Sequence, residues 1–87
     1  MPVRFEADGL APALYPNPVR EMAFIQGLPA GRTDLRIVDA TGRSVAEARK
    51  EGDGDRFEWP LGGLRAGAYQ LQVIQGERSW TLRLLRD

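Results

Sequence analysis

The sequence predicts an all-β fold, an antiparallel β-sandwich of about seven short strands. Segments in which apolar and polar residues alternate are separated by turn-forming residues about every 8–12 residues. No segment repeats apolar residues with the period of a helix. A chain of 87 residues forms one small domain, which buries roughly 60–65% of the surface of its unfolded chain. Strands of this number and spacing are typical of an immunoglobulin-like sandwich.

The first residues are the least clearly patterned part of the chain. Residues 1–13 combine two prolines, a glycine and small or charged residues, so they are predicted to be a linker or a weak first strand. Tyr15 and Asn17 each precede a proline, which restricts both to extended backbone. Pro16 and Pro18 lack an amide N–H, and this segment therefore suits the edge of a sheet or the entrance to a strand.

Alternation and turn chemistry place the later strands. The predicted strands cover residues 21–25, 35–38, 43–50, 57–61, 69–73 and 80–84. Asp39 and Gly42 suit the first and last positions of a hairpin turn between the second and third of these. Residues 46–50 have helical propensity, but five residues are too few to hold a helix, and a continuing strand is expected.

The last three predicted strands each place apolar residues on one face. These residues are Phe57, Trp59, Leu61, Tyr69, Leu71, Val73, Trp80, Leu82 and Leu84. Together with Phe24, the aromatic ones among them allow a second interpretation, a platform on which sugar rings stack. The core interpretation is preferred, because most of these residues alternate with polar neighbours and a small core needs their bulk.

Composition excludes several classes of function. Twelve basic and twelve acidic residues balance, so no polyanion-binding face and no nucleic-acid partner are expected. The chain has no cysteine and no histidine, which excludes disulfides, thiolate nucleophiles and imidazole bases. No run reaches the ~20 apolar residues of a transmembrane helix. The first residues carry charges where a signal peptide needs an apolar stretch, so a signal for export is expected elsewhere, on a longer parent chain.

One acidic loop is a candidate metal site. Glu51, Asp53 and Asp55 have the alternate spacing with which carboxylates bind calcium. The loop lacks the downstream bidentate glutamate of the helical calcium loop, and a hairpin tip is commonly acidic for solubility. Nothing in its surroundings is predicted to raise a carboxyl pKa for acid–base work. No catalytic residue and no cofactor are therefore predicted.

Three motifs in a fixed order carry a family resemblance. They are Tyr15-Pro16-Asn17-Pro18, the hairpin from Leu35 to Val45 with Asp39, Gly42 and Arg43, and the strand motif Leu64-x-x-Gly67-x-Tyr69, with a basic end at Arg86. Together they resemble the type A C-terminal sorting domain of type IX secretion cargo, over residues 14–87. In this chain arginine stands at position 86, where lysine is common in that family, and Asp87 follows it.

The resemblance implies an export address and not an enzyme. Such a domain follows an attached N-terminal cargo into the periplasm and is bound by the type IX translocon and its shuttle proteins. A sortase-like peptidase then removes it, and the cargo reaches the outer-membrane surface or the medium. Cleavage in this family falls just ahead of the sandwich, so residues 1–13 are expected to hold or border the cut.

The resemblance also assigns residues. Pro16, Asn17 and Pro18 match the entry motif, Gly42 the hairpin, and Leu64, Gly67 and Tyr69 the motif of the penultimate strand. The final strand, with Arg83 and Arg86, is where the family places much of its secretion information. An edge strand with free N–H and C=O groups can pair with a strand of the translocon.

Two other functions remain open at this point. One is an accessory immunoglobulin-like module, either a spacer or a carbohydrate-binding unit of an extracellular enzyme. The other is the β domain of a flagellar-hook scaffold protein, which shares the sandwich and the Leu-x-x-Gly-x-Tyr strand. The basic C-terminal strand is the feature that favours the sorting domain.

Overall fold

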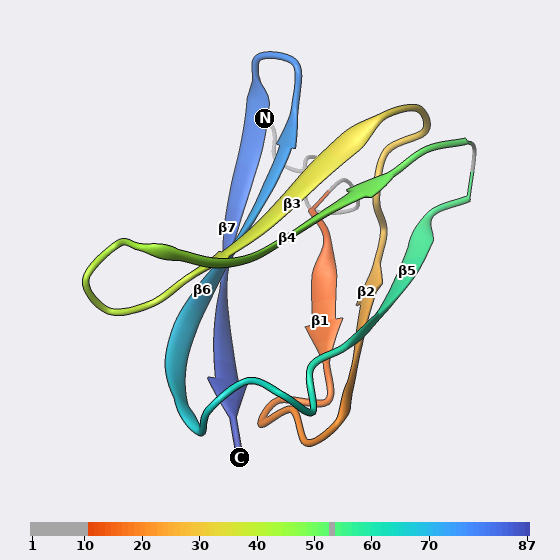
Figure 1. Cartoon of the computed structure of the whole chain (residues 1–87). Helices are drawn as coiled ribbons and strands as arrows, with labels where there is room; N and C mark the ends of the chain where they lie inside the picture. Colours follow the sequence, from red (N-terminus) through yellow and green to blue (C-terminus); the bar gives the residue numbers. More distant parts are fainter. Residues whose placement is uncertain (1–10, 53) are drawn as a thin grey trace, which may run out of the picture.

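The computed structural model describes residues 11–52 and 54–87, in which all regular structure is β. One sheet has three strands in the order β1-β2-β5: β1 (Ala13–Tyr15), β2 (Met22–Gln26) and β5 (Arg56–Pro60). The other has four in the order β4-β3-β6-β7: β4 (Ser44–Lys50), β3 (Thr33–Val38), β6 (Gly67–Gln75) and β7 (Arg78–Arg86) (Figure 1). Every pairing between these strands is antiparallel. The predicted fold class is confirmed.

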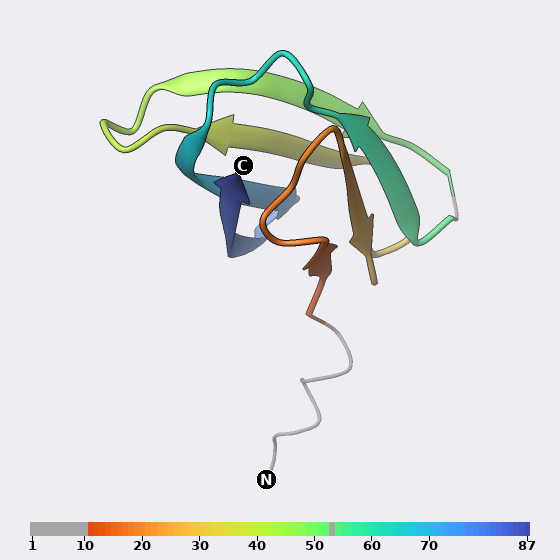
Figure 2. The ribbon, with the colours of Figure 1, turned by 90° about the horizontal axis from the view of Figure 1, so that it is seen from below.

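The strand order is that of an immunoglobulin-like sandwich. The second strand pairs with the fifth in one sheet, and the third pairs with the sixth in the other. Figure 2 shows the two sheets lying face to face. β1 and β7, each at the edge of its own sheet, contact each other along one side of the sandwich. Within residues 11–52 and 54–87, no helix is long and apolar enough to cross a membrane.

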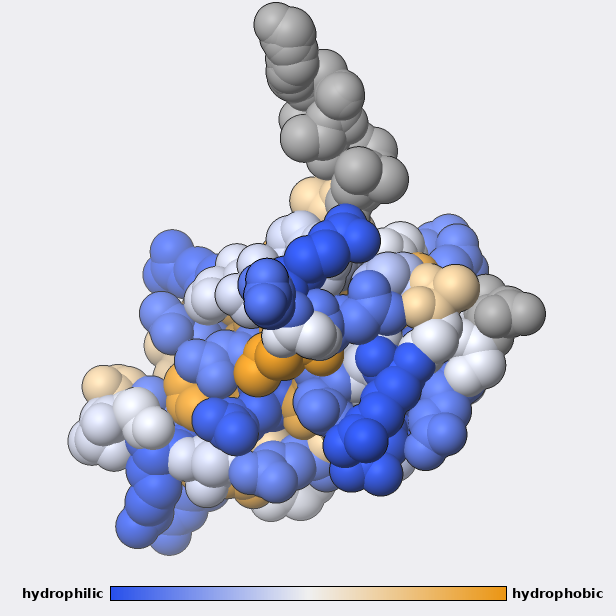
Figure 3. All heavy atoms as spheres, turned by 90° about the horizontal axis from the view of Figure 1, so that it is seen from above, coloured by the Kyte–Doolittle hydropathy of each residue, from blue (hydrophilic) through white to orange (hydrophobic). Residues whose placement is uncertain are grey.

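The core lies between the sheets and is built from alternate residues of both. Its largest fully buried side chains are Ile25, Leu35, Ile37, Leu71, Leu84, Val19 and Val73. Trp59 completes it, while Phe57, Tyr69, Trp80 and Leu82 are partly buried against it. Alternation therefore identified the inner faces of β5, β6 and β7. Seen from above, the end of the molecule in Figure 3 is mostly hydrophilic, with apolar side chains in small separate patches.

Phe24 is the aromatic residue that turns away from the core. Ala23 and Ile25 are fully buried, so Phe24 between them projects from the outer face of the three-stranded sheet. Its ring stacks on Tyr15 with centroids 5.5 Å apart, and the Arg56 guanidinium lies 4.8 Å from its centroid. The interpretation of Phe24 as a core residue is wrong, because four consecutive apolar residues in 22–25 leave no alternation from which to choose the inward face.

A buried lysine joins two loops at one end of the sandwich. Lys50 is 5% exposed at the end of β4. Its ammonium donates to the carbonyls of Pro29 and Gly52, each at 3.1 Å. These bonds satisfy a charged group that would otherwise be costly to bury, and they hold the β2–β3 and β4–β5 loops together.

Candidate functional site

The outer side of β7 is partly covered by a segment from the front of the chain. β7 is an edge strand, with β6 as its strand neighbour on one side. On the other side the amide of Val19 donates to the carbonyl of Leu85 at 2.6 Å. The amide of Asp87 donates back to the carbonyl of Val19 at 2.8 Å. Val19 thus forms a parallel bridge with Arg86, and its own side chain is fully buried.

The side chain of Asn17 continues this contact along the strand. Its Nδ2 donates to the carbonyl of Arg83 at 3.0 Å, and its Oδ1 accepts from the amide of Leu85 at 2.9 Å. The amide group therefore takes the place of a peptide group in a neighbouring strand, because it offers one donor and one acceptor together. We call Asn17 and Val19 the latch. Pro16 and Pro18 flank Asn17 without amide hydrogens that would need partners.

Arg86 binds the loop between β5 and β6. Its Nε donates to the carbonyl of Leu61 at 2.9 Å, and its Nη2 to the carbonyl of Gly62 at 3.0 Å. Nη1 donates to the carbonyl of Asp87. The five donors of a guanidinium suit such a cluster of carbonyls. The half-buried Arg86 therefore secures the end of β7, which sequence reasoning had treated only as a source of charge.

The Leu-x-x-Gly-x-Tyr motif forms a tyrosine corner at the start of β6. The hydroxyl of Tyr69 donates back to the carbonyl of Arg65 at 2.8 Å, as the corresponding tyrosine does in immunoglobulin-like sandwiches. Gly67 has a φ of 154°, and a Cβ there would meet the Tyr69 ring at 3.7 Å. Leu64 packs against the core from the same loop. These three residues shape the corner that leads into β6.

The hairpin between β3 and β4 has the predicted turn. The amide of Gly42 donates to the carbonyl of Asp39 at 2.9 Å, and Gly42 has a φ of 88° that favours glycine. The Asp39 carboxylate accepts from the hydroxyl of Thr41 at 2.6 Å and from the amide of Arg43 at 3.0 Å. The Thr41 hydroxyl bond first, and then the Arg43 amide bond, lower the pKa of Asp39. The turn is structural, and Gly42 is part of its backbone geometry.

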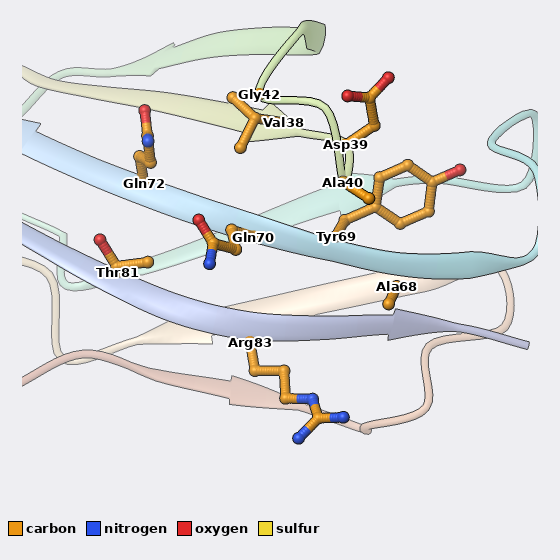
Figure 4. A pocket seen from close by; sticks show the side chains of 10 residues that line it. All are labelled: Val38, Asp39, Ala40, Gly42, Ala68, Tyr69, Gln70, Gln72, Thr81 and Arg83. Atoms are coloured by element: carbon orange, nitrogen blue, oxygen red, sulfur yellow. The ribbon is translucent and has the colours of Figure 1, made fainter.

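Arg83 differs from Arg86 because it is exposed. It lines one end of a shallow groove of about 590 Å³ on the outer face of the four-stranded sheet, with Gln70, Gln72 and Thr81 along its floor. In Figure 4 its guanidinium points away from the other labelled side chains. Within residues 11–52 and 54–87, Arg83 takes part in no ion pair.

The structure brings most of the assigned residues to the C-terminal end of β7. Asn17 contacts the strand directly, with Pro16 and Pro18 beside it, and Arg83 and Arg86 belong to the strand. In the register of β6 and β7, Gly67 lies opposite Arg86 and Tyr69 opposite Leu84. Gly42 belongs to the β3–β4 turn. Val19 was not identified from the sequence, and an ordinary valine after a proline gives no signal by which to find it.

The acidic loop has no described metal site. Asp53 lies outside the described residues, so the proposed set of Glu51, Asp53 and Asp55 is not described as a whole. Among the described residues, no three metal-ligating side chains form a group.

Comparison with protein families identifies the family of this chain. The model of a family described as the secretion system C-terminal sorting domain matches residues 13–86, which is the whole stretch from β1 to the end of β7. No curated protein matches the chain.

Proposed function

The chain belongs to the family of secretion system C-terminal sorting domains, and from this premise we propose that it directs an attached N-terminal cargo through the type IX translocon. The domain acts as a folded ligand of the translocon and its shuttle proteins. A sortase-like peptidase then cuts it from the cargo, which is left at the outer-membrane surface or in the medium. The family is one of sorting signals, so the domain needs no chemistry of its own.

The observation that carries the proposal is the match over residues 13–86 together with the place where the motifs meet. The entry motif, the tyrosine corner and the basic end all lie at the C-terminal end of β7. A domain that works as a label must present one rigid surface. Four hydrogen bonds from the latch and the carbonyl bonds of Arg86 hold this strand end in a single position.

Cleavage is proposed ahead of the sandwich. The first strand begins at Ala13 and its pairing with β2 starts at the same residue. A peptidase needs an extended substrate outside such pairing, so we propose that residues 1–13 hold or border the cut. Sequencing the C-terminus of the mature cargo tests this placement.

The contacts made by two partly exposed aromatic rings disfavour the carbohydrate-binding alternative. Sugar stacking needs the open face of a ring. Phe24 has Tyr15 stacked against it and the Arg56 guanidinium over its ring. The Arg78 guanidinium likewise lies 4.9 Å from the centroid of Trp80. These contacts reduce the aromatic area that a sugar can use.

A fusion experiment tests the proposed function. Residues 1–87 are joined to the C-terminus of a periplasmic reporter and produced in a host with type IX machinery. We expect the reporter outside the cell, shortened by the mass of the domain, and in the periplasm when the translocon is deleted. A reporter retained in the periplasm with a folded, protease-resistant domain would refute the proposal.

Truncation is a poor version of this test. Removing residues 84–87 deletes Leu84, which is 1% exposed in the core, together with three of the four latch hydrogen bonds. The shortened domain is expected to unfold, and loss of export would then say nothing about recognition. Point variants on exposed atoms separate the two effects.

A further inference from the structure

The two halves of β7 differ in the backbone groups that they leave open. The latch bonds to Arg83, Leu85 and Asp87, so the peptide groups of these residues point away from β6. Peptide groups of a strand alternate in direction with a period of two residues. Ser79 and Thr81 therefore also direct their N–H and C=O groups away from β6. Among the described residues these groups have no hydrogen-bond partner, and we call Ser79, Thr81 and the amide of Arg83 the open edge.

The opposite edge of the same sheet is guarded. The register makes Glu47 and Arg49 the residues of β4 whose peptide groups point outward. Their charged side chains are paired across the sheet, Glu47 with Arg36 at 3.7 Å and Arg49 with Asp34 at 3.4 Å. A register shift at Ile37/Val38 interrupts the ladder of β4 as well. Charges and bulges of this kind keep other strands from adding to an edge.

The open edge has different side chains on its two faces. On the inner side Trp80 and Leu82 are only half-buried, because they lie where the two sheets end. On the outer side Ser79, Thr81 and Arg83 are exposed. A strand that continued the sheet would place apolar side chains beside Trp80 and Leu82. Its alternate side chains would lie beside Thr81 and Arg83, where an acidic residue complements the guanidinium.

We propose that the open edge is the docking site for an extended strand of a translocon protein, in which apolar residues alternate with polar ones that include an acidic residue beside Arg83. This inference rests on the proposed function and specifies its partner. The added strand bonds to the peptide groups of Ser79 and Thr81 and to the amide of Arg83. It ends there, because the carbonyl of Arg83 accepts from Asn17 and the amide of Leu85 donates to Asn17. The latch therefore fixes the register of the partner as well as the position of β7.

The test uses proline to remove one outward donor. Thr81→Pro deletes the amide that points to the partner and leaves the bonds to β6 in place, because edge positions tolerate proline when the N–H faces outward. In the reporter fusion we expect export to fall at least about tenfold. Thr81→Val keeps the amide and the shape of the side chain, so its export should exceed that of Thr81→Pro. Glu47→Pro makes the same backbone change on the guarded edge and is expected to export as the unmodified domain does.

Each outcome decides the proposal. Export of the Thr81→Pro fusion at the unmodified level, with a folded domain, overturns it. If that variant does not fold, Arg83→Glu replaces it, with Arg83→Lys as control. Reduced export of Arg83→Glu alone supports the proposal, and equal export of both refutes it. If light scattering shows that the purified chain forms dimers that Thr81→Pro dissolves while export is unchanged, the edge serves a second copy instead. Retention of the unmodified fusion refutes the proposed function itself and this inference with it.

Discussion

The first and second halves of β7 have the same neighbour, β6, and the same alternation of side chains, yet their outer edges are used differently. From Arg83 to Asp87 the outer edge is bonded to Asn17 and Val19, and the side chain of Arg86 binds the adjoining loop. From Ser79 to Thr81 the outer edge has no partner within the described part of the chain. One strand thus supplies both the anchor of the domain and the edge that we propose to be recognised.

In our proposal, this difference allows the last strand of the domain to be recognised while it is already ordered. A free strand end would lose conformational entropy when it docked. Here the sandwich has already ordered β7 before any partner arrives, so only the partner strand must be ordered. The anchor and the open edge are therefore separate targets for substitution, and variants in each half should affect different measurements.

The largest effect is expected from the core residue of the anchored half. Leu84→Ala should lower the free energy of unfolding by about 2–5 kcal/mol, because Leu84 is 1% exposed and its loss leaves a cavity. Leu82→Ala, at a half-buried position nearer the open edge, should cost about 1–2 kcal/mol. Urea unfolding of both variants measures the difference. Equal losses of unfolding free energy would mean that the two halves of β7 are equally buried, which would contradict the difference described above.

Removing the latch should give the next largest effect. Asn17→Ala deletes two hydrogen bonds to β7 and should cost about 1–2 kcal/mol, a decrease in Tm of several degrees. Hydrogen exchange should become faster at the amide of Leu85, which loses its acceptor. The amide of Thr81 should exchange quickly in both proteins. Slow exchange at Thr81 in the unmodified domain would contradict the open edge.

A smaller effect is expected at the tyrosine corner. Tyr69→Phe removes the bond from the hydroxyl to the carbonyl of Arg65 and should cost about 0.5–1.5 kcal/mol. Because Tyr69 lies opposite Leu84 in β7, the loss should appear as reduced thermal stability with the export of a folded fusion unchanged. A variant of unchanged stability but reduced export would instead make the hydroxyl a contact for the partner.

The smallest effect concerns the β3–β4 turn, which is not part of the strand edges compared above. The pKa of Asp39 is lowered by the Thr41 hydroxyl and then by the Arg43 amide, so the folded state favours the carboxylate. Its contribution is present above the ordinary pKa of about 4 and is lost as the pH falls through the lowered value in the fold. Asp39→Asn should therefore flatten the acid side of the stability profile slightly. An identical profile would show that the turn bonds are equally strong without the charge.

Much of the fold could be predicted from local patterns in the sequence. Alternation in 57–61, 69–73 and 80–84 gave strands with correct inner faces, because each has polar residues between its apolar ones. Asp39 and Gly42 gave the hairpin, because turn chemistry is encoded within a few residues. The uniformly apolar 22–25 gave a strand without its orientation, and Phe24 was misplaced for that reason.

The candidate site could be predicted from the sequence only in part. Pro16 and Pro18 indicated an edge, but no local rule links Asn17 to Arg83 and Leu85, which lie 66 and 68 positions away. Their meeting depends on how two sheets stack, and the spacing of residues in one chain does not encode that. Arg86 carries the same charge as Arg83 but lies on the opposite face of β7, and the carbonyls that it binds belong to the β5–β6 loop, whose position the sequence does not give.

The distance along the chain between Asn17 and its partners also has a consequence for synthesis. The ribosome makes β7 after every other strand, and until then neither Leu84 nor the acceptors and donors for Asn17 exist. A polypeptide released early therefore cannot close the sandwich. A domain that lacks its last strand therefore differs in fold from the complete domain, and it also lacks the edge that we propose to be recognised.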